Sequence, residues 1–270
     1  REASARSPHG SPTRFWRRRQ TSLFRRQWEQ DWVRDRVQHR REDVPAGDIE
    51  LNGQHFCGDG AGALYWPAER ILVVADLHLE KGSSFARRGV FLPPYDSAAT
   101  LSNLANVIGR HDPRMVIALG DSFHDGEGAQ RLGTADREVL SGLQAGRDWV
   151  WISGNHDPDP AAGIGGVFRD SLSIGSFVFR HEPGRAPDES EIAGHLHPVA
   201  RVNVRGRTVS RKCFASNGHR LVMPAFGAYT GGLNVRDHAF AAVFDALDFT
   251  AHMLGQTRLY AISAAHCLPD

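Results

Sequence analysis

The sequence has little cysteine, almost no lysine and no long apolar run. Its three cysteines are far apart and form no Cys-x-x-Cys pair, which argues against a disulfide framework and against a zinc site built from thiolates. The only lysines are Lys81 and Lys212. No run approaches the roughly 18 apolar residues of a membrane span, and no apolar segment typical of a signal peptide follows the Arg- and Ser-rich start. We therefore expect a protein of a reducing, cytoplasmic compartment without a transmembrane segment.

Positive charge is concentrated at the start of the chain. The formal net charge is +1, yet residues 1–45 carry twelve arginines against six acidic residues. Within 14–41, Phe24, Trp28 and Trp32 recur every four residues, which predicts an amphipathic, Arg-rich helix. Such a helix could pack its Trp stripe on the protein itself, which is the default interpretation, or bind nucleic acid or a membrane surface. We treat residues 1–45 as a basic N-terminal extension.

After this extension, short apolar strands alternate with helices. Apolar runs predict buried strands over 71–75, 115–119 and 149–153, with helices over 96–109 (capped by Asp96 or Ser97) and 134–145 (capped by Thr134). From about residue 171 strands dominate, and they are expected over 177–180, 200–204, 208–210, 221–223 and 239–244. This order predicts a mixed α/β fold of two packed sheets with helices outside. We assign the domain to residues 46–245 and expect 246–270 to be a loosely attached C-terminal tail.

Polar segments follow several of the predicted strands. They are Asp76-Leu77-His78, Gly120-Asp121-Ser122-Phe123-His124, Gly154-Asn155-His156-Asp157 and Gly194-His195-Leu196-His197, with His181 following a further strand. Each segment alone is common, but four of them in this order, each after an apolar run, are hard to obtain by chance. Because ligands of α/β sheets bind outside the carboxyl ends of strands, we expect these side chains to converge on one crevice.

The residue types in these segments suit a pair of metal ions. Histidine, aspartate and asparagine offer the nitrogen and oxygen ligands that bind manganese, iron or zinc. A carboxylate can bridge two cations, and two cations about 3.5–4 Å apart can clamp a phosphoryl group and polarise a water into hydroxide. Glycines before Asp121, Asn155 and His195 permit the tight turns that aim the next side chain. The pattern therefore predicts a two-metal phosphoesterase.

The series of motifs resembles the signature of calcineurin-like metallophosphoesterases, a family with a four-layer αββα sandwich of two mixed β-sheets flanked by helices. The resemblance implies that one ion is held by Asp76, His78 and His197, a second by Asn155, His181 and His195, and that Asp121 bridges them. Manganese is the expected metal, with iron or zinc as alternatives.

The same resemblance implies the catalytic residues. His156 would stabilise the transition state or protonate the leaving oxygen, with Asp157 or another acid orienting it. Many family members carry aspartate at the position of His124. The version with histidine is more similar to the branch that contains double-strand-break repair nucleases. The partner that orients His156 therefore stays open at the level of sequence.

A closer resemblance covers more of the chain. The stretches 75–101, 193–198 and 224–234 are similar to bacterial ligase-associated DNA-damage-response endonucleases. This resemblance implies manganese-dependent phosphodiester cleavage, including cleavage of DNA strands, a role in DNA repair, and association with a DNA ligase or helicase. Residues 1–45 and 246–270 have no part in it.

Candidate substrate contacts surround the motifs. Just beyond the first motif, groups able to bind phosphate are supplied by Lys81, Ser83, Ser84, Arg87 and Arg88. Tyr95 could stack on a base, or it could simply pack. A second basic cluster, which could follow a DNA backbone or be an exposed strand face, contains Arg201, Arg205, Arg207, Arg211 and Lys212.

The sequence thus predicts a DNA-cleaving phosphodiesterase with two manganese-class ions. Two alternatives stay open. The same chemistry could act on a small molecule, as a phosphodiesterase or phosphatase. The chain could also be a metal-binding scaffold without turnover, although its intact set of ligands argues against that.

Overall fold

The computed structural model describes residues 46–158, 163–185, 189–245, 247–256 and 258–270. The chain divides into two units, residues 1–43 and 44–270, and the following description concerns the second. The helix predicted over 14–41 lies outside the described residues, so its role stays a prediction. No helix among the described residues is long and apolar enough to cross a membrane.

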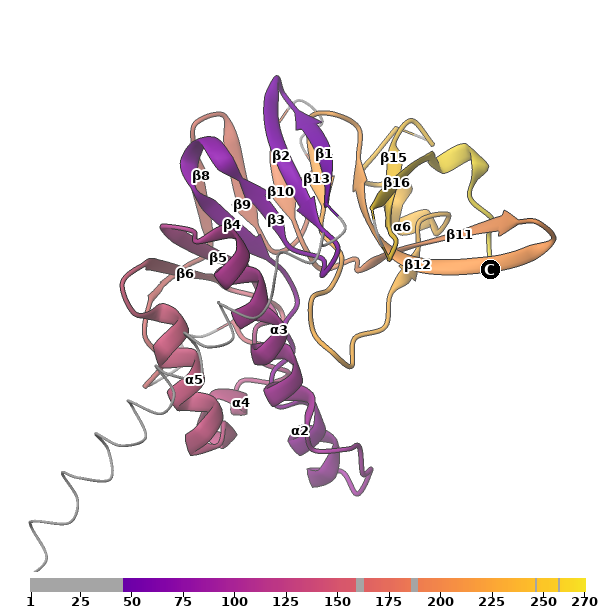
Figure 1. Cartoon of the computed structure of the whole chain (residues 1–270). Helices are drawn as coiled ribbons and strands as arrows, with labels where there is room; N and C mark the ends of the chain where they lie inside the picture. Colours follow the sequence, from indigo (N-terminus) through magenta and orange to yellow (C-terminus); the bar gives the residue numbers. More distant parts are fainter. Residues whose placement is uncertain (1–45, 159–162, 186–188, 246, 257) are drawn as a thin grey trace, which may run out of the picture. The chain divides into compact units, whose positions relative to one another are not determined.

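The first sheet has seven strands that follow one another in chain order (Figure 1). Its strands are β1 (Ala46–Leu51), β2 (Gln54–Asp59), β3 (Leu64–Trp66), β4 (Ile71–Val74), β5 (Met115–Leu119), β6 (Asp148–Ile152) and β7 (Val167–Arg169). Strands β1 to β4 pair antiparallel, whereas β4 to β7 pair parallel. Of the parallel strands, β4, β5 and β6 are the buried apolar runs of the sequence, and their carboxyl ends share one edge of the sheet.

Helices connect the parallel strands and cover the outer face of this sheet. They are α2 (Lys81–Arg87), α3 (Asp96–His111), α4 (Gly128–Arg131) and α5 (Thr134–Gln144), after the one-turn helix η2 (Pro67–Glu69). Helices α3 and α5 bury Leu104 and Leu140 in a cluster with Val116 and Trp151 of the sheet. The expected caps of α3 have other partners, because Asp96 accepts from the Gly82 N–H and Ser97 Oγ contacts Glu80.

The second sheet has the strand order β14-β11-β12-β13-β10-β9-β8, with β15 and β16 added beside β12. Its strands are β8 (Ser171–Ile174), β9 (Phe177–Arg180), β10 (Glu191–Ala193), β11 (Pro198–Val204), β12 (Arg207–Ser216), β13 (Arg220–Val222), β14 (Leu233–Asn234), β15 (Thr250–Leu254) and β16 (Leu259–Ser263). Strands β9, β10 and β13 run parallel to one another.

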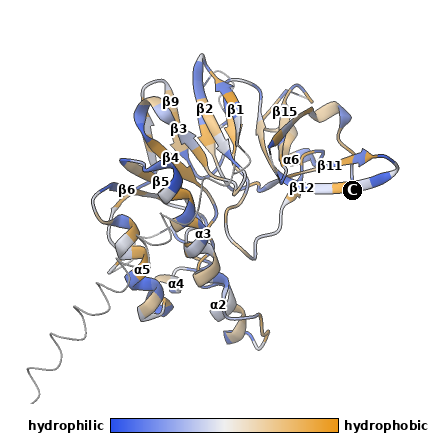
Figure 2. Ribbon diagram, in the orientation of Figure 1, coloured by the Kyte–Doolittle hydropathy of each residue, from blue (hydrophilic) through white to orange (hydrophobic). Residues whose placement is uncertain are grey.

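The two sheets pack face to face through one apolar core. Side chains of the first sheet such as Phe56 and Ile117 join Phe177, Ile192 and Phe214 of the second in a single buried cluster. The alternation of apolar and polar positions is visible along the strands (Figure 2). The prediction of a mixed α/β fold with two mixed sheets and helices outside is thereby confirmed.

Two predictions about the last part of the chain are wrong. Residues 239–244 do not form a strand: α6 (His238–Ala241) begins there, because Asp237 accepts a hydrogen bond from the Ala239 N–H as a helix cap. Phe240 and Phe244, four residues apart, both pack under the second sheet.

The segment after residue 245 is also not loosely attached. Its described residues form β15, which pairs with β12, and β16, followed by the one-turn helix η3 (Ala264–His266). Ala264 and Cys267 are buried in the same cluster as Phe240 and Phe244. These short strands have few buried residues, so their sequence pattern is weak. The domain boundaries at residues 45 and 245 themselves stay predictions.

Candidate metal centre

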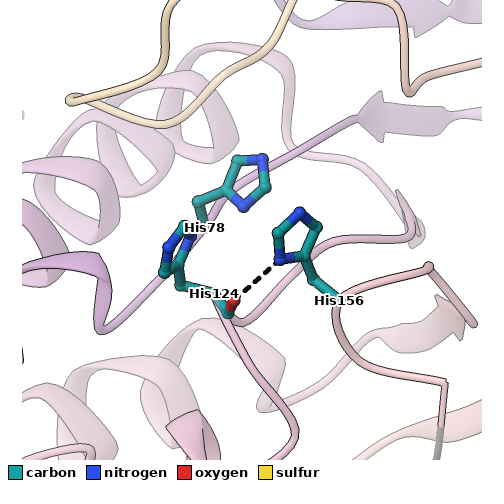
Figure 3. Close-up of side chains that lie close together, drawn as sticks. All are labelled: His78, His124 and His156. Carbon is teal, nitrogen blue, oxygen red and sulfur yellow. Dashed lines mark hydrogen bonds between the residues drawn. The ribbon is translucent and has the colours of Figure 1, made fainter. Parts of the chain in front are cut away.

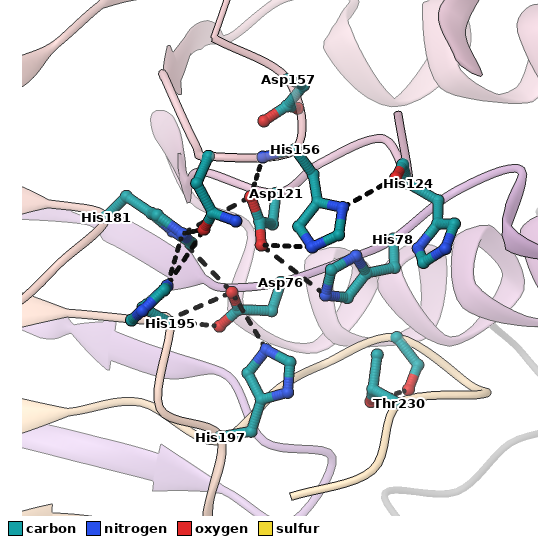
Figure 4. A network of polar contacts seen from close by, with 12 residues as sticks. Asp76, His78, Asp121, His124, His156, Asp157, His181, His195, His197 and Thr230 are labelled. Carbon is teal, nitrogen blue, oxygen red and sulfur yellow. Dashed lines mark hydrogen bonds and ion pairs between the residues drawn. The ribbon is translucent and has the colours of Figure 1, made fainter. Parts of the chain in front are cut away.

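The predicted metal ligands all follow the carboxyl ends of strands. Asp76, Asp121 and Asn155 follow β4, β5 and β6 of the first sheet, whereas His181 and His195 follow β9 and β10 of the second. The two edges meet, since the His195 N–H donates to Asp76 across them, at 3.1 Å from Oδ2. Both sheets therefore contribute to the place where the predicted ligands come together (Figure 4).

The backbone at the centre is in an unusual conformation. Five of the predicted ligands have positive φ values between 44° and 70°, namely Asp76, His78, Asp121, His195 and His197. Residues other than glycine rarely adopt this left-handed region, and such conformations cluster at functional sites. Gly154 is required by close approach, because a Cβ there would collide with Asp121. The local fold is thus built to direct side chains inward.

A first group of donor atoms contains Asp76, His78 and His197. Their ligand atoms lie within 4.8 Å of one another. His197 Nε2 is 3.2 Å from Asp76 Oδ1, but this buried nitrogen has no hydrogen-bond partner among the described residues. Two potential ligand atoms that converge without forming a hydrogen bond are arranged as a cation would require.

A second group contains Asp121, His181 and His195, whose ligand atoms also lie within 4.8 Å of one another. Asn155 Oδ1 joins them, at 2.9 Å from His181 Nε2 and 3.1 Å from His195 Nδ1. His181 Nδ1 lies 2.9 Å from the Leu119 carbonyl oxygen, which fixes the ring and leaves Nε2 facing the group.

Asp121 lies between the two groups. Its Oδ1 is 3.4 Å from His181 Nε2 of the second group, and its Oδ2 is 3.9 Å from His78 Nε2 of the first. The carboxylate is buried and is held by the backbone N–H of His156, which donates to Oδ1 at 2.9 Å. One carboxylate therefore presents a different oxygen to each donor group, which is the geometry of a bridging ligand.

The protonation of the imidazoles also suits metal binding. Burial, followed by electrostatic interaction with the neighbouring imidazoles of His197 and His156, lowers the pKa of His78 to about 2. Burial and the neighbouring His181 lower the pKa of His195. Neutral imidazoles keep the lone pairs that cations need. The donor set, the bare His197 nitrogen and the bridging carboxylate together fit two divalent cations of the manganese, iron or zinc class.

His156 stands beside the donor groups with a partner that the sequence did not identify. Its Nδ1 lies 2.9 Å from the carbonyl oxygen of His124, and its Nε2 faces the centre at 3.9 Å from Asp121 Oδ2. The His124 ring stacks on it, with centroids 5.2 Å apart (Figure 3). Ligand atoms of His78, His124 and His156 also lie within 4.8 Å of one another.

Asp157 does not contact the His156 ring. Its Oδ2 accepts a hydrogen bond from the Phe123 N–H at 3.0 Å, whereas its buried Oδ1 has no partner among the described residues. Burial raises the pKa of Asp157 to about 6. The carboxylate thus holds the segment that carries the His124 carbonyl, and that carbonyl in turn contacts the His156 ring.

The predicted substrate-binding side chains differ in whether other residues already bind them. Lys81 Nζ donates to the Tyr229 carbonyl oxygen, and Ser83 Oγ donates to the Glu80 carbonyl oxygen and accepts from Arg131. Arg87 forms an ion pair with Glu127, and Ser84 is buried. Arg88 and Tyr95 are exposed.

Lys212 plays a part that the sequence did not reveal. It was expected in a basic cluster on a hairpin, but it is half-buried and donates to the Ala225 and Gly227 carbonyl oxygens and to Thr230 Oγ1, at 2.8, 3.2 and 2.9 Å. Arg201 of the same cluster pairs with Asp270. The sequence did carry one signal, because only two lysines occur in a chain rich in arginine. In the structure both lysines donate to the loop of residues 225–230.

This loop lies directly against the metal-ligand segments. The Gly227 N–H donates to the Asp76 carbonyl oxygen at 3.1 Å, and a Cβ at Gly227 would collide with Leu77. The chain continues from this loop into β14, where the Leu233 N–H donates to the His197 carbonyl oxygen at 3.0 Å. Thr230 lies beside the donor network (Figure 4). The loop therefore braces both segments that supply the first donor group.

Comparison with known proteins shows the family of this chain. Residues 69–223, more than half of the chain, match the family model of calcineurin-like phosphoesterases, and this segment contains all seven donor residues. The crystal structure of the Pseudomonas putida nuclease MPE is 28% identical, with a TM-score of 0.61, and the match covers 80% of this chain and 100% of that one. The E. coli phosphoesterase Yfce is 11% identical, with a TM-score of 0.36, over 72% of this chain and 98% of its own. No curated protein matches the sequence.

Proposed function

Because the chain belongs to the calcineurin-like phosphoesterase family and is a metal-dependent phosphoesterase, we propose that it cleaves phosphodiester bonds of DNA with two divalent cations bound at the candidate metal centre. The observation that carries this proposal is the position of Asp121, whose two carboxylate oxygens face two separate donor groups. The likeness to a nuclease supports a nucleic acid as the substrate.

Each donor group would hold one ion. Asp76, His78 and His197 would bind the first, and Asn155, His181 and His195 would bind the second, with Asp121 shared between them. When bound, a pair of manganese-class ions supplies Lewis-acid stabilisation of the phosphoryl oxygens and activates a water for attack on phosphorus.

His156 would provide the proton for the leaving group. Donation of its Nδ1–H to the His124 carbonyl oxygen leaves Nε2 directed at the centre, on the side of Asp121. As water oxygen bonds to phosphorus and the bond from phosphorus to the leaving oxygen breaks, a proton on Nε2 passes to that oxygen. His156 is the catalytic residue of this step, whereas His124 and Asp157 position it.

The finer parts of the proposal rest on the resemblance to ligase-associated endonucleases. On that basis we extend the proposal to manganese as the metal, to a role in DNA repair beside a ligase or helicase, and to a cytoplasmic location. The nuclease likeness supports the substrate class alone.

A cleavage assay with two substrates tests the proposal. Purified protein with Mn²⁺ is given circular plasmid DNA and bis-p-nitrophenyl phosphate in parallel, with the Asp76→Ala/His78→Ala variant as the control. We expect the wild type to nick the plasmid and the variant to leave it intact. Ester hydrolysis without nicking would move the substrate to a small molecule, and inactivity on both would favour a scaffold without turnover.

A further inference from the structure

Exposed apolar side chains are concentrated in one short segment. Among the described residues, six large apolar side chains are exposed, and three of them, Val90, Phe91 and Tyr95, lie within six residues of the α2–α3 connection. Phe91 is 86% exposed and Tyr95 is 68% exposed, the two highest values of the six. Two aromatic side chains that stay exposed to water contribute no burial free energy to the fold. A cluster of such side chains often marks a binding site, so residues 90–95 are a candidate for one.

The segment is fixed at both ends. After α2, the Gly89 N–H donates to the Ala86 carbonyl oxygen and the Val90 N–H to that of Phe85, at 3.0 and 3.1 Å, in the pattern of a Schellman motif. Such a motif usually folds the residue at the Val90 position back onto the helix, yet Val90 is half exposed. Pro93 and Pro94 stiffen the return into α3. The aromatic rings are therefore presented on a preorganised turn.

The turn is connected to the candidate metal centre by α2. This helix begins three residues after His78, and its seven residues span about 10 Å, a length that roughly three stacked nucleotides cover. Midway along it, the Phe85 ring lies 5.5 Å from the ring of His124, which in turn stacks on His156. In Figure 1, α2 leads away from the two sheets toward this connection.

Charge favours a phosphate-bearing ligand at the same place. Arg88 is exposed, and its guanidinium makes no hydrogen bond or ion pair within the part of the chain that the structure describes. Along the chain it lies between the first donor segment and the aromatic residues, at the C-terminal end of α2. A cation at this position can bind a backbone phosphate while neighbouring rings take up bases.

The size of the patch selects among possible ligands. Phe91 and Tyr95 together would bury about 300–500 Å², which is less than the ~800 Å² that each partner contributes to a stable protein interface. Nucleobases need only one ring face each. Within a duplex those faces are already covered by neighbouring base pairs, so only an unpaired strand can offer them.

We propose that residues 90–95, with Arg88, form a binding site for unpaired nucleotides, in which Phe91 and Tyr95 stack on bases of the strand whose phosphodiester lies at the metal centre. The inference rests on the proposed function and adds the place on the fold, the turn between α2 and α3, at which bases of the substrate strand are bound.

Binding of a labelled oligonucleotide tests this site. The full chain carrying His156→Ala, with Mn²⁺, is titrated against a fluorescent thymidine oligonucleotide of about 12 nucleotides and a duplex of equal length, and gels verify that the strands stay intact. We expect Phe91→Ala and Phe91→Leu each to weaken single-strand binding about 5- to 100-fold and to affect duplex binding less. Phe91→Trp, which keeps an aromatic face, should bind within about twofold of the parent.

The matched control is Tyr260→Ala, which removes an exposed aromatic ring on β16, outside the proposed site, and should leave binding unchanged. Undiminished binding by Phe91→Ala would overturn the inference. So would full binding by Phe91→Leu, which would indicate apolar docking of a protein, or an equal loss on duplex DNA. Wild-type hydrolysis of bis-p-nitrophenyl phosphate alongside any of these results would leave the proposed function standing. Failure of that hydrolysis together with absent nicking would reject the proposed function itself.

Discussion

Five residues of the candidate metal centre keep a backbone conformation that costs free energy. Each non-glycine residue in the left-handed region costs on the order of 1–3 kcal/mol, and it persists only where its surroundings enforce it. Here the His78 N–H donates to the Asp121 carbonyl oxygen at 2.9 Å, so two ligand-bearing turns hold each other in place. The strain directs Asp76, His78 and Asp121 inward before any ion binds.

His156 should matter for turnover and not for metal binding. Its ring approaches the centre at Asp121 Oδ2, 3.9 Å away, and at the His78 ring, with centroids 5.2 Å apart, whereas its Nδ1 is committed to the His124 carbonyl oxygen. Loss of a general acid typically costs 10²–10⁴-fold, so His156→Ala is expected to lower kcat by about that factor with bis-p-nitrophenyl phosphate. Manganese affinity, measured by titration, should stay near that of the wild type. Near-normal turnover would remove His156 from the mechanism.

At the scale of single residues, the sequence was sufficient to predict which polar side chains the structure brings together, and insufficient for the contacts that support them. Asp76, Asn155 and His181 could be found because a strand end followed by a polar residue is a local signal. The orientation of His156 by a main-chain carbonyl could not be predicted, because every residue type carries such a carbonyl. Lys212 was misplaced because a cation next to arginines predicts a surface cluster, whereas its burial depends on a loop thirteen residues later.

At the scale of elements, the strength of the apolar pattern decided which strands were predictable. Strand β5 is almost continuously buried and strand β9 carries two buried phenylalanines, and both have the bounds that the sequence predicted. Strand β15 buries only Ala251 and Met253, and strand β16 has no buried residue, so their pattern was too weak. Helix α6 was missed since its Asp237 cap resembles an ordinary turn residue.

The 225–230 loop is the element that we expect to control the first metal. Lys212→Met removes three hydrogen bonds from this loop, and the loop is bonded to the Asp76 main chain. Mutating the outer supports of metal ligands typically costs 10–100-fold in affinity, so we expect Mn²⁺ to bind about 10-fold more weakly. Arg211→Met removes the same charge from the adjacent, exposed position and should bind Mn²⁺ normally. Equal affinities for the two variants would show that the loop does not brace the ligands.

The same lysine predicts a pH dependence of stability. Burial lowers the pKa of Lys212 from 10.5 to about 8. Between these two values the unfolded chain binds the proton and the folded chain does not, so the free energy of unfolding rises with pH through this window. The wild type should gain up to about 3 kcal/mol relative to Lys212→Met between about pH 8 and pH 10.5. Urea unfolding across that range checks this, and parallel curves for the two proteins would contradict it.

At the scale of the whole molecule, the metal centre lies where two sheets meet. The first sheet supplies Asp76 and Asp121, and the second supplies His181 and His195, so cations bound there would link the sheets. An ion at about 100 times its Kd stabilises the folded state by about 2.7 kcal/mol, or about 5–10 °C in Tm for a unit of 227 residues. Mn²⁺ should therefore raise Tm over EDTA by at least that amount in the wild type. The Asp76→Ala/His78→Ala variant should show a smaller rise, and an equal rise would place the ions elsewhere.

The central claim, that one carboxylate joins two ions, is tested most directly by the EPR spectrum of the Mn²⁺-loaded protein. The positions of the two Asp121 oxygens predict two Mn²⁺ per chain whose spins are exchange-coupled. In Asp121→Asn, weaker occupancy of both sites and loss of the coupled signal are expected. A wild-type protein that binds a single ion, or two ions with uncoupled spectra, would contradict the account.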